Sequence, residues 1–361
     1  MAGKLFFIVA GVYLAALLGA WWTVPQVSSL SVQGSHAKAS AVQSVGMSLT
    51  LYHLDDLRSA YEAVDGIVAL GCNSLQVVTP VFQEHGGSPT VNVRIGPGLG
   101  PSEDQILAVL GYAQSKGLRT ALLPQVNFTA PRGNEWRGKL TPRQWSVWWD
   151  SYETMLDHFL TLAQKAQVQV FCVGCELLTT QKPEHLERWR SLIGRARKRF
   201  DGTLVYATNW DSYATVGFWD QLDAIGISAY WDLTLQASDP EHPTDAELDA
   251  GWQTIRQQLL AYAETQKRPV LFTELGYPGL PWALDRPWNY IAAANTLPDL
   301  KAQDAGYRAF VRAWGDLIPS TDPRLAGVFF YTWDLYRPSP DTGYSIDGKP
   351  AQKTVQQWLD P

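Results

Sequence analysis

A (β/α)8 barrel, the TIM-barrel class of α/β fold, is the fold that this sequence predicts. Eight short apolar runs rich in Val, Ile and Leu recur along the chain, and stretches with the spacing of amphipathic helices separate them. Strand-like runs that alternate with helix-like stretches indicate βα units, which build parallel sheets. The chain has 361 residues, of which 46% are apolar and 18% are charged, so it can bury a large core. Eight such units over residues 45–361 are enough to close a barrel.

The predicted elements follow one another in a regular order. Strands are expected at residues 45–51, 74–79, 119–124, 168–174, 203–208, 224–229, 269–273 and 327–332. Helices are expected at residues 55–70, 102–116, 142–166, 183–200, 216–221, 245–266 and 299–318, with a last helix beginning near residue 355. The strands are short and largely apolar, as expected of parallel strands covered on both faces. Ser102, followed by two acidic residues, and Pro142 mark helix starts because capping residues and an early proline favour the first turn.

The N-terminus has a different composition from the barrel. Residues 5–24 read LFFIVAGVYLAALLGAWWTV, without a charge, after Lys4. Residues 1–24 are therefore expected to be a signal anchor or a signal peptide. The uncleaved anchor is favoured because Leu18 is large for a cleavage site. Residues 25–44 form a Ser-rich linker, and residues 45–361 form one catalytic domain, expected to be monomeric and extracytoplasmic, either membrane-anchored or, after cleavage, secreted.

Composition excludes several classes of function. The net charge of −6, with no basic run, argues against nucleic-acid binding. The three cysteines cannot all pair, and Cys172 and Cys175 lie in a strand-like run, so buried free thiols are expected. The six histidines lack the spacing of a metal site, so no metal and no cofactor are expected. The 16 Trp, against 15 Tyr and 12 Phe, indicate that flat amphipathic surfaces are needed.

Two strands of the predicted barrel end in a glutamate. Glu176 follows the fourth strand in FCVGCELL, and Glu274 follows the seventh in PVLFTELGYPG. The active sites of these barrels lie where the strands end. An ionised carboxylate after an apolar run is costly unless it is paired or used. Two carboxylates at one barrel mouth are what glycoside hydrolysis requires, because one protonates the leaving oxygen while the other attacks the anomeric carbon.

Aromatic residues beside amides or acids mark other strand ends. Such faces suit sugar rings, whose apolar faces are edged by hydroxyls. The candidate substrate-binding residues are Asn127 after the third strand, Trp136 and Arg137 in the loop that follows, Asn209 and Trp210 after the fifth, Tyr230 and Trp231 after the sixth, Tyr277 after the seventh, and Trp333 and Asp334 after the eighth.

The chain resembles glycoside hydrolase family 113, within the clan A retaining glycosidases. The resemblance runs from about residue 46 to residue 358 and is carried by the segments LLPQVNF, EWRGKL, WWDSYETML, VGCELL, VYATNWD, FWDQLDAIGISAYWDL and FTELGYPG. Family members are mainly β-mannanases. The resemblance implies a (β/α)8 fold, a retaining mechanism and an oligosaccharide or polysaccharide substrate.

The resemblance also implies roles for single residues. Glu176 would be the general acid and base, Glu274 the nucleophile, and Tyr230 would hydrogen-bond the nucleophile. Trp333 would floor the subsite of the attacked sugar, and Trp210 with Asn209 would line it. Glu176 should start protonated, with a raised pKa, and Glu274 ionised.

One residue departs from the clan pattern. Many clan members carry Asn before the acid and base, where it contacts the sugar 2-hydroxyl, and here that residue is Cys175. A thiol donates only weakly, so the choice between mannose and glucose stays open.

The sequence thus predicts a retaining hydrolase of β-linked neutral hexose chains, with β-1,4-mannan or glucomannan as the first substrates to test. The alternatives are a non-catalytic, membrane-anchored glycan-binding barrel and an envelope assembly protein that reuses the fold. Turnover of an oligosaccharide would separate an enzyme from both.

Overall fold

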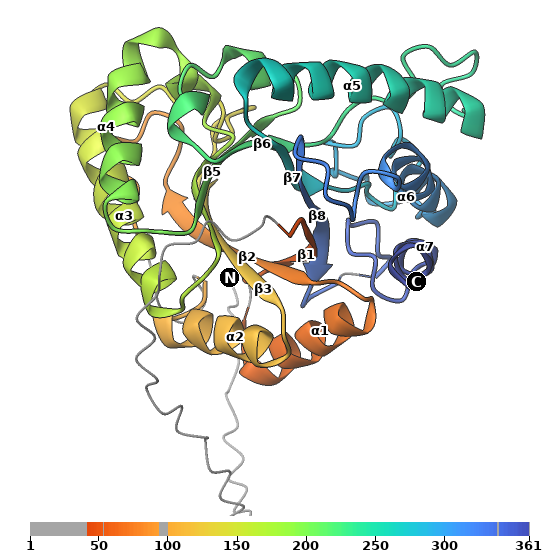
Figure 1. The fold of residues 1–361 in the computed structure, drawn as a ribbon, viewed down its shortest axis with the longest axis horizontal. Coiled ribbons are helices and arrows are strands. Elements are labelled where there is room, and N and C mark those ends of the chain that lie inside the picture. The colour runs from red at the N-terminus through yellow and green to blue at the C-terminus, as the bar shows by residue number, and fades with distance from the viewer. Residues whose placement is uncertain (1–41, 53, 94–99, 338, 361) are drawn as a thin grey trace, which may run out of the picture. The chain divides into compact units, whose positions relative to one another are not determined.

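The computed structural model describes residues 42–52, 54–93, 100–337 and 339–360. Within them, parallel strands pair in chain order and close into a barrel (Figure 1). The strands are β1 (Ser44–Thr50), β2 (Ser74–Gln83), β3 (Arg119–Phe128), β4 (Val170–Cys175), β5 (Thr203–Asn209), β6 (Ala224–Ser228), β7 (Val270–Leu275) and β8 (Leu325–Asp334). The predicted (β/α)8 fold is therefore confirmed, with all eight strands close to their expected positions.

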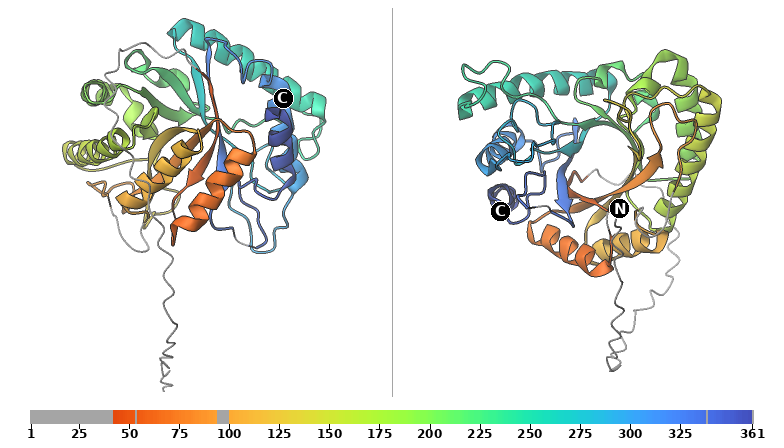
Figure 2. Two further views of the ribbon diagram at one scale, coloured as in Figure 1. Left: turned by 60° about the horizontal axis from the view of Figure 1, so that its bottom comes forward. Right: turned by 180° about the vertical axis from the view of Figure 1, so that it is seen from behind.

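Helices surround the barrel in chain order, as Figures 1 and 2 show. They are α1 (Leu57–Ala69), α2 (Glu103–Ser115), α3 (Trp145–Lys165), α4 (Leu186–Arg197), α5 (Asp245–Gln266), α6 (Leu300–Trp314) and α7 (Pro350–Leu359). The predicted start at Ser102 is confirmed, because its side chain caps α2 by accepting from the Gln105 backbone N–H. The short helix predicted at residues 216–221 was wrong, since that stretch holds only a three-residue 3-10 turn, Trp219–Gln221.

Strands β2 and β3 extend beyond their predicted ends. Prolines stand at the predicted end of β3 and just past that of β2, yet the pair continues in register from Thr79 and Pro124 to Gln83 and Phe128. Side chains alternate across a strand, so the interior row of Ala121 and Leu123 continues to Gln125 and Asn127 at the mouth. The extension therefore brings two polar residues of β3 to the mouth of the barrel.

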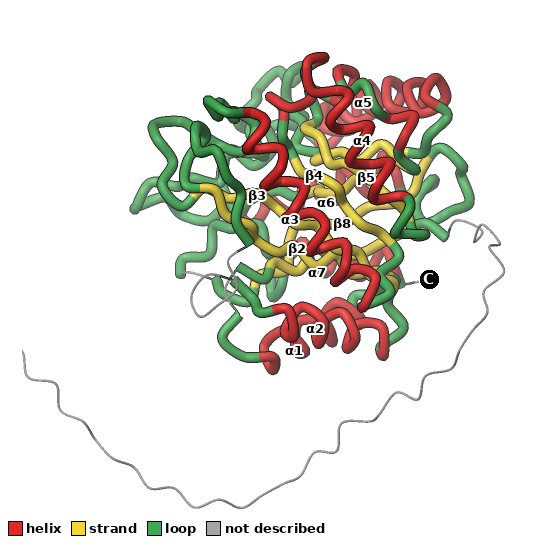
Figure 3. Tube along the Cα trace, turned by 90° about the vertical axis from the view of Figure 1, so that its left-hand side faces the viewer, coloured by secondary structure: helices red, strands yellow, loops and turns green. Residues whose placement is uncertain are grey.

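Two apolar layers hold the fold together. Val78, Leu123, Val205 and other residues fill the barrel interior. A larger cluster lies between the outer face of the strands and the helices, which cover the barrel on its outside in Figure 3. The largest side chains of this outer layer are fully buried tryptophans: Trp148, Trp149, Trp189, Trp219, Trp252 and Trp314. Much of the tryptophan content therefore packs helices on strands and does not form a binding surface.

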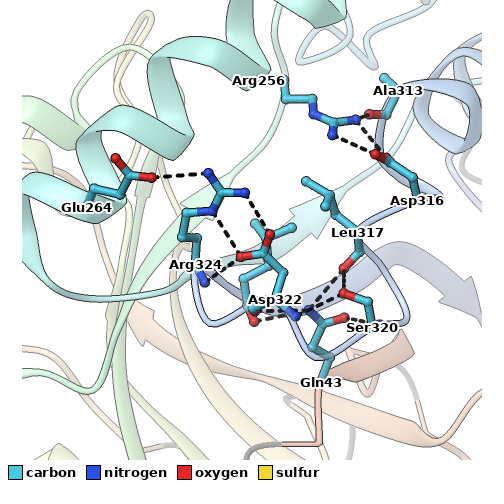
Figure 4. Close-up of polar contacts among 10 residues, drawn as sticks. Gln43, Arg256, Glu264, Ala313, Asp316, Leu317, Ser320, Asp322 and Arg324 are labelled. Atoms are coloured by element: carbon cyan, nitrogen blue, oxygen red, sulfur yellow. Dashed lines mark hydrogen bonds and ion pairs between the residues drawn. The ribbon is translucent and has the colours of Figure 1, made fainter.

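A polar network closes the barrel at the N-terminal ends of its strands (Figure 4). Gln43, just before β1, donates to the carbonyl of Leu317 at 3.0 Å and accepts from the Ser320 backbone N–H at 2.8 Å. Arg324 pairs with Asp322 at 2.7 Å and with Glu264 of α5 at 3.1 Å. These bonds tie the loop between α6 and β8 to the first strand, at the face opposite to the mouth.

The predicted signal segment, residues 1–24, and most of the predicted linker lie outside the described residues. None of the helices in the described ranges is long and apolar enough to cross a membrane.

Candidate active site

The two predicted glutamates lie at the C-terminal ends of their strands. Glu274 is the penultimate residue of β7, and Glu176 directly follows β4. Both are buried, with 3% and 7% of their surface exposed. The Glu176 backbone has φ 55° and its N–H donates to the Ala207 carbonyl at 2.7 Å, so the chain turns sharply there and the carboxylate stays at the mouth.

Three donors surround the Glu274 carboxylate. The Tyr230 hydroxyl donates to Oε2 at 2.7 Å, and Gln125 Nε2 donates to Oε1 at 3.1 Å. The Cys175 thiol lies 3.7 Å from Oε1. The Tyr52 hydroxyl donates to Gln125 Oε1, which leaves the Gln125 amide nitrogen to face the carboxylate. Tyr230 therefore lies where the sequence places it, whereas Gln125 and Tyr52 were not identified from the sequence.

The electrostatics of the pair differ from the sequence-based expectation. Burial, followed by the charge of Glu176, raises the pKa of Glu274 to about 7 against the lowering effect of Tyr230 and Arg137. The raised pKa was expected on Glu176. Burial dominates because Glu274 is enclosed at the mouth between Tyr230 and Gln125. Glu274 can therefore hold a proton up to about neutral pH.

Arg137 holds the Glu176 side chain from the loop after β3. Its Nη1 donates to Glu176 Oε2 at 2.9 Å, and its Nε donates to the Val126 carbonyl at 2.9 Å. Its Nη2 donates to Asn127 Oδ1 at 3.2 Å, so Asn127 belongs to the same group. Trp136, the preceding residue in this loop, is half-buried and covers Gly138, where a Cβ would lie 2.4 Å from the indole ring. The structure thus joins Arg137 and Asn127 to the carboxylates and places Trp136 on the flank of the loop.

Tyrosines line the mouth around Glu274. Tyr344 lies with its ring 5.8 Å from that of Tyr230 and 5.5 Å from that of Tyr331. Burial and the negative charge of Glu274 raise the pKa of Tyr52, Tyr331 and Tyr344, so these hydroxyls remain protonated. Tyr331 and Tyr344 were also missed. The only sequence signal is that Tyr52 follows the first strand and Tyr331 stands at the end of the eighth.

Trp333 does not floor the site. It is 6% exposed and packs in the outer layer against α1, where a Cβ on Gly66 would lie 2.6 Å from its ring. The cause is a register shift between β1 and β8, in which Ser48 pairs with Tyr331 but Leu49 pairs with Trp333. Leu49 faces the helices, and its partner Trp333 faces the same side of the sheet. Tyr331 therefore occupies the mouth in its place.

Two more predicted substrate residues pack outward. Tyr277 is 1% exposed, with its ring 5.5 Å from that of Tyr307 on α6. Trp231 is half-buried and lies edge-on to Trp252 of α5, with ring centroids 6.0 Å apart. Both fill the helix layer, because each lies an odd number of residues after a side chain that faces the mouth: Trp231 one residue after Tyr230, and Tyr277 three residues after Glu274. Asp334 is held at the β1–β8 seam by the Thr50 hydroxyl at 2.6 Å.

An aromatic shelf extends from the carboxylates over β5 and the loop between β7 and α6. Trp210 stacks on Trp288 with ring centroids 4.9 Å apart and planes 19° apart. Trp210 also lies edge-on to Tyr230 at 6.4 Å. Trp288 is 41% exposed, so the shelf presents an open aromatic face. Asn209, beside Trp210, is buried at the mouth.

The described residues contain no group of three or more His, Cys, Asp or Glu side chains that could hold a metal ion. Cys72, Cys172 and Cys175 are free and buried, as the sequence predicts.

Comparison with known proteins adds independent findings. The sequence model of Glycoside Hydrolase Family 113 matches residues 56–349. No curated protein sequence matches the chain. Among solved structures, a family 113 β-mannanase from Alicyclobacillus acidocaldarius, in complex with ManMIm, is 26% identical with a TM-score of 0.74, over 89% of this chain and 99% of that one.

Two further structures show likeness of fold alone. A family 113 β-1,4-mannanase is 20% identical with a TM-score of 0.74, over 88% of this chain and 98% of that one. A family 5 mannosidase from Rhizomucor miehei is 12% identical with a TM-score of 0.60, over 88% and 92% of the two chains.

Proposed function

Because the chain belongs to glycoside hydrolase family 113 and is therefore a glycosidase, we propose that it is a retaining hydrolase that cleaves β-1,4-linked mannan or glucomannan. One observation carries the proposal. Two buried glutamates stand at the ends of β4 and β7, and one of them, Glu274, has a pKa raised to about 7 and a tyrosine hydroxyl at 2.7 Å. A pair that shares one proton can supply both the acid and the nucleophile of glycoside cleavage.

The proposed mechanism assigns one role to each carboxyl group. Glu274, in its ionised form, attacks the anomeric carbon, and the bond to the leaving oxygen breaks as Glu176 delivers its proton to that oxygen. A glycosyl ester on Glu274 results. Glu176, now a carboxylate, takes a proton from water, which attacks the anomeric carbon and releases the sugar with its configuration retained. Each cycle returns one proton to Glu176 and leaves Glu274 ionised.

Glu274 is the better candidate for the nucleophile because of its contacts. Tyr230 and Gln125 donate one bond to each of its oxygens, at 2.7 Å and 3.1 Å, so the carboxylate is fixed in one orientation. Among the described residues, the Glu176 carboxyl group accepts one side-chain hydrogen bond, from Arg137 at 2.9 Å. It is therefore held by fewer donors than Glu274, which suits a group that must give and take a proton.

The mouth favours a neutral sugar chain. The guanidinium beside the carboxylates, that of Arg137, is paired with Glu176 at 2.9 Å, and the shelf of Trp210 and Trp288 offers flat apolar faces. Stacking on such faces recognises a sugar ring without requiring charge. The 26% identical structure is that of a β-mannanase, so mannan is the first choice of substrate.

The test uses the two glutamate variants with azide. Glu274→Ala should lose hydrolysis of aryl β-mannosides, and azide should restore turnover with an α-glycosyl azide as product, because the anion attacks from the vacated side. Glu176→Ala should still form the glycosyl-enzyme from substrates with activated leaving groups, and azide should then yield the β-glycosyl azide. Glu187→Ala, an exposed glutamate on α4, serves as the control and should match the parent protein.

Three outcomes would contradict the proposal. If Glu274→Ala retained the parent rate, Glu274 would not be the nucleophile. If both variants gave the same azide anomer, the two roles would be wrongly assigned. No turnover of any manno- or gluco-oligosaccharide by the parent protein would instead favour a glycan-binding or assembly protein.

We also propose, from the sequence alone, that residues 1–24 retain the barrel at the outer face of a membrane. Full-length protein should remain in the membrane fraction through a carbonate wash, with its N-terminus intact. Recovery of soluble protein that begins beyond residue 20 would show cleavage instead.

A further inference from the structure

Asn209 has an unsatisfied polar atom at the mouth of the barrel. It is the last residue of β5 and is 6% exposed, and its Oδ1 is buried without a hydrogen-bond partner. A buried acceptor without a donor costs about 1–3 kcal/mol, so such atoms call for an explanation. The Ser228 hydroxyl on the neighbouring strand is also buried and unpartnered.

The strand register places Asn209 beside the reacting groups. Asn209 pairs with Ser228 of β6, and Ser228 pairs with Glu274 of β7. On the other side, Cys175 of β4 pairs with Ala207 of β5, whose carbonyl accepts from the Glu176 backbone N–H at 2.7 Å. Asn209 therefore lies on the strand between the two glutamates, two residues above Ala207.

Side-chain alternation directs Asn209 into the mouth. Val205 and Ala207 of the same strand belong to the cluster inside the barrel. Tyr206 packs in the outer layer, and the Thr208 hydroxyl accepts from Gln181 at 2.7 Å outside the barrel. Because alternate residues share a face, Asn209 continues the interior row at the level where a sugar would bind.

Cys175 is poorly suited to bind a sugar hydroxyl. Its sulfur already accepts from Gln125 at 3.5 Å, and its thiol is directed to Glu274 at 3.7 Å. A thiol is also a weak donor and a weak acceptor compared with an amide. The amide of Asn209 is the better partner on this side of the site.

We propose that Asn209 is a specificity-determining residue whose Oδ1 accepts a hydrogen bond from the sugar 2-hydroxyl. This inference rests on the proposed glycosidase function. When Glu274 attacks the anomeric carbon, the sugar hydroxyl closest to it is the 2-hydroxyl, on the adjoining ring carbon. This hydroxyl therefore also lies near Asn209, which the strand register places beside Glu274. A hydrogen bond to this hydroxyl strengthens in the transition state, so it can select between an axial and an equatorial group.

The experiment compares three aryl β-glycosides with the same leaving group. They are the mannoside, the glucoside and the 2-deoxy-arabino-hexoside, which is the deoxy analogue of both. The ratio of kcat/KM between the better hydroxylated substrate and the deoxy substrate measures the value of the hydroxyl contact and cancels general losses. It is measured in the full-length protein and in Asn209→Ala, Asn209→Ser, Cys175→Ala and Thr208→Val.

We expect the ratio to fall by at least about tenfold in Asn209→Ala, because one transition-state hydrogen bond is lost. Asn209→Ser should show the same fall, since its shorter side chain cannot reach, and it tests the idea even where Asn209→Ala folds poorly. Cys175→Ala should keep the parent ratio even if its absolute rates change. Thr208→Val, the outward-facing neighbour on β5, should keep both the ratio and the rates.

The inference is overturned if Asn209→Ala and Asn209→Ser keep the parent ratio while the parent protein is active. It is also overturned if the ratio falls instead in Cys175→Ala, because the thiol would then bind the hydroxyl. A parent protein that hydrolyses none of the hydroxylated glycosides would overturn the proposed function, and this inference with it.

Discussion

Replacing Tyr230 by phenylalanine should change the pH dependence of the enzyme in a defined direction. The Tyr230 hydroxyl donates to Glu274 Oε2 at 2.7 Å, and both side chains are buried. The bond stabilises the ionised form of Glu274, so its loss raises the pKa of that carboxyl group further. A hydrogen bond to a charged group is worth about 1.5–3 kcal/mol, and each pKa unit corresponds to about 1.4 kcal/mol. The shift should therefore be about one to two units.

The sign of the kinetic effect follows from the proton that the proposed mechanism needs. The mechanism needs one proton on the pair, because Glu176 must deliver it to the leaving oxygen while Glu274 attacks. Glu274 holds that proton up to its pKa of about 7, and above this pH the pair has lost it, so kcat/KM should fall as the pH rises through about 7. In Tyr230→Phe the pair retains this proton to higher pH, and the basic limb should move up to about pH 8 or 9. The maximal kcat/KM should also drop by about 10–100-fold, because the proton is held more firmly on the nucleophile.

The assay is kcat/KM for an aryl β-mannoside from about pH 5 to about pH 10, at constant ionic strength. Tyr344→Phe is the matched control, because the Tyr344 ring lies 5.8 Å from Tyr230 but its hydroxyl donates to the Pro287 carbonyl at 2.5 Å. That variant should keep the basic limb in place. A limb in Tyr230→Phe that stays at the parent position, or moves to lower pH, would refute the reasoning.

Other consequences of the structure can be measured directly. Trp288→Ala should raise KM for long mannooligosaccharides by about tenfold and leave aryl monosaccharide turnover nearly unchanged, because it removes half of the Trp210–Trp288 stack; equal losses on both substrates would contradict a shelf for chain binding. Trp333→Ala should lower the free energy of unfolding in urea by about 3–5 kcal/mol, because Trp333 packs in the core. A variant that is stable but inactive would show that Trp333 belongs to the substrate site after all. Gln43→Ala should cost about 1–3 kcal/mol of stability, with kcat/KM unchanged, because it leaves the Ser320 N–H and the Leu317 carbonyl without their partner; an unchanged melting temperature would show that the base network is not stabilising.

Most of the predicted residues that reach the site stand at the end of a strand or just after it, and Arg137, in the loop after β3, is the exception. Glu176, Glu274 and Tyr230 follow apolar runs in which the strand end is easy to place, and the barrel rule then directs attention to them. The fold was predictable for the same reason, because eight apolar runs separated by amphipathic stretches admit few topologies.

Gln125 and Tyr52 could not be identified from sequence because their role depends on neighbours far along the chain. Gln125 matters because it lies between the Tyr52 hydroxyl and Glu274, which is 149 residues further on. Within its own strand it follows a proline and resembles a loop residue. The pKa of Glu274 is a property of the same kind, since it depends on burial and on the charge of Glu176.

Trp333 shows how a single register shift makes side-chain alternation predict the wrong residue for the site. In an undistorted strand, Phe329, Tyr331 and Trp333 would all face the barrel interior, since residues two apart share a face. Phe329 does lie inside, but the shift between Ser48 and Leu49 skips one residue of β8, so Trp333 turns to α1 while Tyr331 remains beside Glu274. A shift of one residue moves a side chain to the other face of the sheet, and nothing in the local sequence YTWD marks it. Aromatic residues at strand ends therefore predict that a sugar platform exists at this mouth, but the pairing of the strands decides which ring provides it.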